Sequence, residues 1–228
     1  MVEQTPAHEV PMTGARAVAE VISRQISPTV YGMPGGHTIL IFDALRAIGA
    51  AANVHLVRQE SVGTVMAEAQ GRLTGFPAFV IGQGSWILGN AGIGIMEAHL
   101  SASPVVILVD ATDGGYYSHH GPYQTGFGGY GAYDLRAALQ AITKRTFLAM
   151  DPTQALQMTQ LAIKHAMTGE PGPVAVVFHS RALFDSIDPR LQPPVYLDHP
   201  YVDSTSRAAD AETVKRAAEM IRGSAAPV

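Results

Sequence analysis

The sequence contains no cysteine, and only 15% of its 228 residues are charged. The lack of cysteine excludes disulfides, a thiolate nucleophile and cysteine-ligated zinc. Fifteen basic against nineteen acidic residues give a formal net charge of −4, so no basic surface is expected for nucleic acid or for an anionic membrane. The nine histidines show no HExxH spacing, and no metal site is therefore expected in this chain.

Signals for export and for membrane insertion are also missing from the sequence. Residues 1–10 have neither the basic start nor the apolar run of a signal peptide, which favours a cytoplasmic location. Residues 73–96 carry no charge, but glycine, proline and polar residues interrupt them throughout. This segment is expected to form a strand, a loop and a helix of a soluble domain.

What the sequence does have is a regular alternation of helix-like and strand-like segments, with 47% hydrophobic residues to build a core. Apolar spacing predicts helices over 15–25, 39–48, 61–74 and 89–99, and strands over 29–31, 53–58, 78–82 and 104–110. Such alternation is typical of an α/β fold with a parallel sheet flanked by helices on both faces. Ligands are then expected beyond the carboxyl ends of the strands.

The amino-acid composition changes twice in the second half of the chain. Residues 112–133 are rich in glycine and contain five tyrosines, which predicts a long loop. Helices follow over 137–143 and 152–167, with strands over 146–149 and 174–178. We expect a tail over residues 1–12, one domain over 13–184, a proline-rich linker over 185–209 and a terminal amphipathic helix within 210–228.

Glu60 is the strongest single candidate for chemistry. It follows a predicted buried strand and has uncharged neighbours, Gln59 and Ser61. A partly desolvated carboxyl group there suits proton transfer or a hydrogen bond to a heterocyclic nitrogen. The alternative is a structural ion pair with Arg58 or Arg72.

Two histidines in the glycine-rich loop form a second candidate. His119 and His120 lie beyond the predicted central strand, where imidazoles relay protons near neutral pH. The alternative is a pair of solvated loop histidines. His37 is a weaker candidate, and His99 is expected to pack against the sheet.

Two further patterns near strand ends carry less information. The Gly82-Gln83-Gly84 stretch resembles a phosphate loop but lacks the GxGxxG or GxxxxGK[ST] pattern. Asp110 and Asp113 follow the predicted central strand, but acidic residues at strand ends commonly form turns or cap helices.

Several ordered stretches together resemble one family. The stretches TGARAVAEVISRQ, VYGMPGGHTILIFDAL, VRQE, GRLTGFPA, GNAGIGIMEAHLSASPVVILVD, ITKRTF and GEPGPVAVVF follow one another in family order between Thr13 and Leu183. They resemble the N-terminal, pyrimidine-binding domain of thiamine-diphosphate-dependent enzymes of the acetolactate synthase and 2-oxoacid decarboxylase superfamily.

The resemblance implies roles for individual residues. Glu60 falls on the glutamate whose carboxyl group hydrogen-bonds the aminopyrimidine ring of the cofactor and promotes its imino tautomer. His119 and His120 resemble the histidine pair with which pyruvate-type decarboxylases move protons. The resemblance also places Pro34, Gly35 and Asn90 on the cofactor side, and Gly36, His37 and Gln83 on the substrate side. Gly36 stands where decarboxylases have an acidic residue, as in acetolactate synthases.

The resemblance further implies a partner. No GDG motif, which marks the diphosphate- and Mg²⁺-binding domain of the family, occurs in this sequence. We therefore expect a fragment or a split subunit in a homo- or hetero-oligomer, acting on a small 2-oxoacid by decarboxylation or carboligation. A non-catalytic assembly or regulatory module with the same fold is the alternative. A dinucleotide-binding oxidoreductase is disfavoured, because no glycine fingerprint opens a helix after the first strand.

Overall fold

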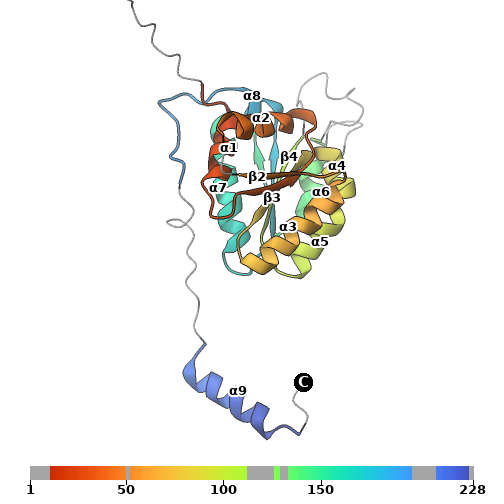
Figure 1. Ribbon diagram of the computed structural model, residues 1–228, viewed down its shortest axis with the longest axis vertical. Coiled ribbons are helices and arrows are strands. Elements are labelled where there is room, and N and C mark those ends of the chain that lie inside the picture. The colour runs from red at the N-terminus through yellow and green to blue at the C-terminus, as the bar shows by residue number, and fades with distance from the viewer. Residues whose placement is uncertain (1–10, 50–51, 112–125, 129–132, 197–208, 226–228) are drawn as a thin grey trace, which may run out of the picture.

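A parallel β-sheet forms the centre of the molecule. The computed structural model describes residues 11–49, 52–111, 126–128, 133–196 and 209–225 (Figure 1). Within them, six strands lie in the order β2-β1-β3-β4-β6-β5, and every neighbouring pair is parallel. The strands are β1 (Thr29–Gly32), β2 (Asn53–Leu56), β3 (Ala78–Gln83), β4 (Val105–Asp110), β5 (Arg145–Ala149) and β6 (Pro173–Phe178).

Helices cover both faces of this sheet (Figure 1), which confirms the predicted fold class. One face packs against α1 (Gly14–Ser23), α2 (Ile39–Ala47), α7 (Pro152–Met167) and α8 (Ser180–Phe184). The other packs against α3 (Glu60–Thr74), α4 (Gly84–Asn90), α5 (Gly92–Leu100) and α6 (Leu135–Ile142). A short 3₁₀ helix, η1 (Gly36–Thr38), precedes α2. Among the described residues, no helix combines the length and the apolar character needed to cross a bilayer.

The central strands are apolar on both sides because each faces a helical layer. In β4, Val106 and Leu108 belong to the core beneath α1 and α7, whereas Val105, Ile107 and Val109 belong to the core beneath α3 to α6. Side chains of a strand alternate between faces, so a strand buried on both sides shows a continuous apolar run. Asp110, which ends β4, is the exception to that run.

The structure corrects one predicted helix. The sequence pattern predicts a single helix over 89–99, but α4 and α5 are two helices joined at Ala91. Ile87 in α4 is fully buried. Gly84 permits the close packing of α4, since a Cβ at this position would lie 2.2 Å from the backbone oxygen of Asp110. Long-range packing therefore forms a helix where the local glycines suggest a loop.

Part of the segment predicted as a linker packs against the sheet domain. Ile187 is buried in the core of α1 and α7, and its N–H donates to the Met12 carbonyl oxygen at 2.8 Å. The Tyr196 N–H donates to Gln160 Oε1 at 2.7 Å. Near the end of the chain, α9 (Ala211–Gly223) begins after the capping residue Asp210, as the sequence pattern predicts, and none of its residues is buried.

Candidate functional site

The predicted site residues lie where the parallel strands end. The register pairs Gly32 with Leu56 and Gln83 with Asp110, so strands β1 to β4 end at one edge of the sheet. β1 and β3 are neighbours in the sheet. From β1 the chain continues to β2, on the side of β1 away from β3, and from β3 it continues to β4, on the side of β3 away from β1. Neighbouring strands with such diverging connections mark the position where open α/β sheets bind ligands.

Glu60 is a buried carboxyl group at the start of a helix. It is the first residue of α3, and 2% of its surface is exposed. Its Oε2 accepts a hydrogen bond from Asn90 Nδ2, at the end of α4, at 3.0 Å. The alternative ion pair with Arg72 does not form, because Arg72 binds Glu68 at 2.6 Å and Glu97 at 2.7 Å.

The surroundings of Glu60 leave one of its oxygens available. Among the described residues, Asn90 is the hydrogen-bond partner of its side chain, through Oε2. A Cβ at Gly82 would lie 3.7 Å from Glu60 Cγ and 2.8 Å from Ile87 Cδ1, so this glycine lets β3 pass close to both. A buried carboxyl group with an open oxygen fits a heterocycle that offers a ring nitrogen, because buried polar groups normally have partners.

A second carboxyl group, that of Asp110, connects two segments that follow the carboxyl ends of neighbouring strands. The His37 N–H in η1 donates to Oδ2 at 2.6 Å, and the Gly84 N–H at the start of α4 donates to Oδ1 at 3.0 Å. Gly36 has φ +52°, and a Cβ there would lie 2.2 Å from Oδ2. Asp110 thus ties the segment after β1 to the segment after β3.

The electrostatics around Asp110 involve two neighbouring side chains. Burial raises the pKa of Asp110, against the N–H groups of His37 and Gly84 and the His37 ring, which lower it. His37 Nδ1 lies 3.6 Å from Oδ2 and has no hydrogen-bond partner in the described structure. Burial also raises the pKa of Tyr133, whose hydroxyl lies 2.6 Å from Ser85 Oγ; the charge of Asp110 adds to this shift.

The structure brings most of the predicted site residues together in two adjoining groups. Glu60 and Asn90 form one group. Gly36, His37 and Asp110 form the other, with Gly35 packed against Gln83: a Cβ at Gly35 would lie 3.3 Å from Gln83 Oε1. The remaining predictions are distributed as follows: Pro34 is exposed beside Gly35, His119 and His120 lie outside the described residues, and His99 is exposed rather than packed against the sheet.

Asp110 is the residue whose importance the sequence pattern understates. It acts as a cap, as one of the sequence alternatives has it, because it accepts the first N–H of α4. The signal in the sequence is one acidic residue directly after five apolar residues of a central strand. Its second bond, to the loop after β1, connects residues 73 positions apart. In the described part of the chain, no group of three or more His, Asp or Glu side chains has a metal-binding arrangement.

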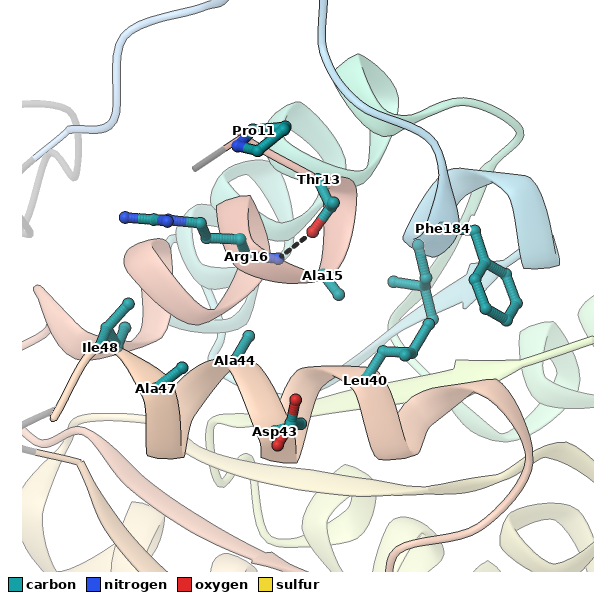
Figure 2. Close-up of a pocket in the computed structure, with 11 residues that line it drawn as sticks. Pro11, Thr13, Ala15, Arg16, Leu40, Asp43, Ala44, Ala47, Ile48 and Phe184 are labelled. Atoms are coloured by element: carbon teal, nitrogen blue, oxygen red, sulfur yellow. Dashed lines mark hydrogen bonds between the residues drawn. The ribbon is translucent and has the colours of Figure 1, made fainter. Parts of the chain in front are cut away.

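A separate cleft of about 570 Å³ lies between α1, α2 and α8 (Figure 2). Its walls include Leu40 and Ala44 of α2, Ile48 directly after α2, and Leu183 and Phe184 of α8. These elements cover the face of the sheet opposite α3, so the cleft does not include Glu60 or Asn90. Phe184 connects it to the site through an edge contact with the His37 ring at 5.2 Å between centroids.

Comparison with known proteins gives a consistent family match. Residues 12–128 match the family described as thiamine pyrophosphate enzyme, N-terminal TPP binding domain. The chain is 30% identical over 168 residues to the acetolactate synthase isozyme 3 large subunit of Escherichia coli, covering 72% of this chain and 27% of that protein. It is 29% identical over 170 residues to the chloroplastic acetolactate synthase 3 of Brassica napus, covering 75% and 25%. The chain thus spans about a quarter of the length of the curated relatives it matches.

Proposed function

The chain belongs to the thiamine pyrophosphate enzymes, of which it carries the N-terminal TPP binding domain, and on this premise we propose that it supplies the pyrimidine-binding part of an enzyme acting on a 2-oxoacid. Glu60 carries this proposal, because its carboxyl group is 2% exposed, has one oxygen held by Asn90 and leaves the other available to a ligand. An aminopyrimidine ring is such a ligand.

The role proposed for Glu60 is to hold a proton on the pyrimidine ring. Asn90 fixes Oε2 at 3.0 Å, which leaves Oε1 to face the ring nitrogen. A proton shared between Oε1 and that nitrogen is sheltered from water by the burial of the carboxyl group. Thiamine diphosphate, when bound, supplies a nucleophilic carbon and an electron sink for cleavage beside a carbonyl group. Glu60 and Asn90 thus orient and protonate one ring, and the reaction proposed is 2-oxoacid decarboxylation or carboligation.

An apolar surface beside Glu60 supports a partner domain. Val62, Val65 and Met66 of α3 and Ile93 and Met96 of α5 are exposed at helical spacing on adjacent helices. A contiguous exposed apolar surface of this kind marks an interaction site. We propose that it binds a diphosphate-binding domain, which would hold Mg²⁺ and the cofactor diphosphate and come from a separate subunit or from further domains of the same enzyme. The match covers only 27% and 25% of the two relatives, whose remaining length leaves room for such a domain.

The test uses the natural assembly. The chain is tagged, purified with its partners from cells that produce it, and supplied with thiamine diphosphate, Mg²⁺ and pyruvate or 2-oxobutyrate. We expect 2-oxoacid consumption by the unmodified assembly and a loss of about 100-fold or more in Glu60→Gln, the range that one general acid or base contributes. Glu20→Gln on α1, the matched control, should retain full activity. Equal rates for Glu60→Gln and the control would refute the assignment and favour the non-catalytic module.

A further inference from the structure

We propose that Asp110 and His37 form an acid–base dyad on the substrate side of the site, with Asp110 positioning the imidazole and His37 exchanging the proton. In the direction that re-forms the carbonyl group, the hydroxyl group derived from the 2-oxoacid carbonyl loses its proton to His37 Nε2. The resulting imidazolium charge then lies beside the Asp110 carboxylate, and the reverse step returns the proton to oxygen. The dyad presupposes the proposed function for its substrate.

The first support is the way in which the backbone fixes Asp110. Its two oxygens accept N–H groups from different loops, His37 N at 2.6 Å and Gly84 N at 3.0 Å. The carboxyl group is 2% exposed, so water does not compete for these bonds. The oxygen that binds the His37 backbone, Oδ2, is also the one nearest to the imidazole. The position of this acceptor relative to the ring is therefore set by the backbone.

The second support is an unsatisfied atom of the imidazole. His37 Nδ1 is buried, lacks a hydrogen-bond partner in the described structure and lies 3.6 Å from Oδ2. A carboxylate only accepts hydrogen bonds, so a proton on Nδ1 is the arrangement that satisfies both groups. That tautomer leaves the lone pair on Nε2. The separation exceeds a hydrogen bond, as catalytic bonds often do before substrate binds.

Contacts on the other side of the ring and the neighbouring charges agree with this arrangement. Phe184 meets the His37 ring edge-on at 5.2 Å between centroids, with 71° between the ring planes. In the described structure, the titratable groups that face Asp110 are His37 in η1 and Tyr133 ahead of α6. The Tyr133 hydroxyl is engaged with Ser85 at 2.6 Å. Of these two groups, only the imidazole of His37 forms a cation by taking up a proton. A cation beside the buried Asp110 carboxylate lowers the energetic cost of burying that negative charge.

A tautomer measurement tests the dyad without any cofactor. The full chain is labelled with ¹⁵N-histidine, and the Nδ1 and Nε2 shifts of His37 are assigned with His37→Gln. We expect the Nδ1–H tautomer in the unmodified chain and a shift toward Nε2–H in Asp110→Asn, whose amide group offers a donor. The exposed Asp43→Asn should leave the spectrum unchanged. An Nε2–H tautomer in the unmodified chain, or no response to Asp110→Asn, would overturn the dyad.

The kinetic test separates the dyad from the proposed function. In the purified assembly, His37→Gln should lower kcat for the 2-oxoacid about 100-fold with a much smaller change in KM. Asp110→Asn should lower kcat and move the acidic limb of its pH profile, which a mere loop clamp would not do. If Glu60→Gln abolishes turnover while His37→Gln keeps the unmodified kcat and pH profile, the dyad is wrong and the proposed function stands. If Glu60→Gln is fully active, the proposed function fails, whatever the tautomer.

Discussion

The carboxyl group of Asp110 occupies the space that a side chain at Gly36 would need. A Cβ at Gly36 would lie 2.2 Å from Asp110 Oδ2, and Gly36 adopts φ +52°, a conformation that favours glycine. The same oxygen accepts the N–H of His37, the next residue. The loop after β1 and the end of β4 therefore meet at Asp110 Oδ2. Substitution of Gly36 tests how much this close approach contributes to stability.

Gly36→Ala should destabilise the fold more than Gly49→Ala. Both glycines have positive φ, but nothing lies within 4 Å of a Cβ at Gly49. Conformational strain alone should cost about 1 to 2 kcal/mol at either position. At Gly36 the clash with Asp110 adds to it, and urea unfolding measures the difference. Equal losses for the two variants would show that the close approach has no energetic consequence.

The stability of the chain should respond to pH through Asp110. Burial raises the pKa of Asp110 above its unfolded value of about 3.9, so the folded state binds more protons between the two values. The free energy of unfolding therefore falls as pH rises through that window. Asp110→Asn lacks this contribution. The stability of the unmodified chain relative to Asp110→Asn should therefore decline as pH rises above about 3.9 in urea unfolding. A difference that does not change with pH would contradict this assignment.

Glu68 should have the opposite pH dependence. Burial alone would raise its pKa, but hydrogen bonds from Ser103, Arg72 and Ser101 outweigh this and lower the pKa below its usual value. Its contribution to stability is therefore present above the unfolded pKa of about 4.3 and lost as pH falls through the lower folded pKa. Glu68→Gln should be less stable than the unmodified chain at pH 7, with the gap closing toward pH 3. A gap that stays constant with pH would contradict this assignment.

A charge on the apolar surface of α3 and α5 should prevent assembly. Ile93 is 67% exposed beside the end of α4 that carries Asn90. Ile93→Glu should weaken association with the diphosphate-binding partner at least tenfold, since a charge buried in an interface is costly unless it is paired. Leu191→Glu, at a position with 68% exposure in the segment after α8, is the control. Sedimentation of the purified assembly measures the effect, and unchanged association of Ile93→Glu would place the interface elsewhere.

The sequence predicts the elements that depend on local pattern and misses those that depend on contact between distant segments. The long apolar runs of β3 and β4 and the amphipathic pattern of α7 reveal the parallel sheet directly. The helix α4 is not predicted, because glycines in a sequence indicate a loop. In the structure, Gly84 instead allows α4 to pack closely against the end of β4. Periodicity finds helices and strands but carries no information on such approaches.

The same distinction applies to the site. Glu60 is predicted from its place after a strand that is expected to be buried, but β2 is exposed along its whole length, and the burial of Glu60 comes from its position at the start of α3. Its bond to Asn90 links two residues that the family resemblance already names. Asp110 has no local signal beyond its position at a strand end, where turn formers and caps are common. Asp110 connects the loop after β1 to the start of α4. This role follows from the parallel register, which places Asp110 beside Gln83 and within hydrogen-bond distance of the loop after β1.

The most direct measurement of the central claim is the binding of the pyrimidine half of thiamine to the full chain. The aminopyrimidine alcohol of thiamine needs no diphosphate site, and its titration is followed by NMR at the Asn90 side-chain amide, which bonds Glu60 at 3.0 Å. We expect saturable shifts with a Kd of about 1 mM, or roughly −4 kcal/mol. They should be lost in Glu60→Gln and retained in Glu20→Gln. Identical titrations for Glu60→Gln and the unmodified chain would contradict a pyrimidine site at Glu60.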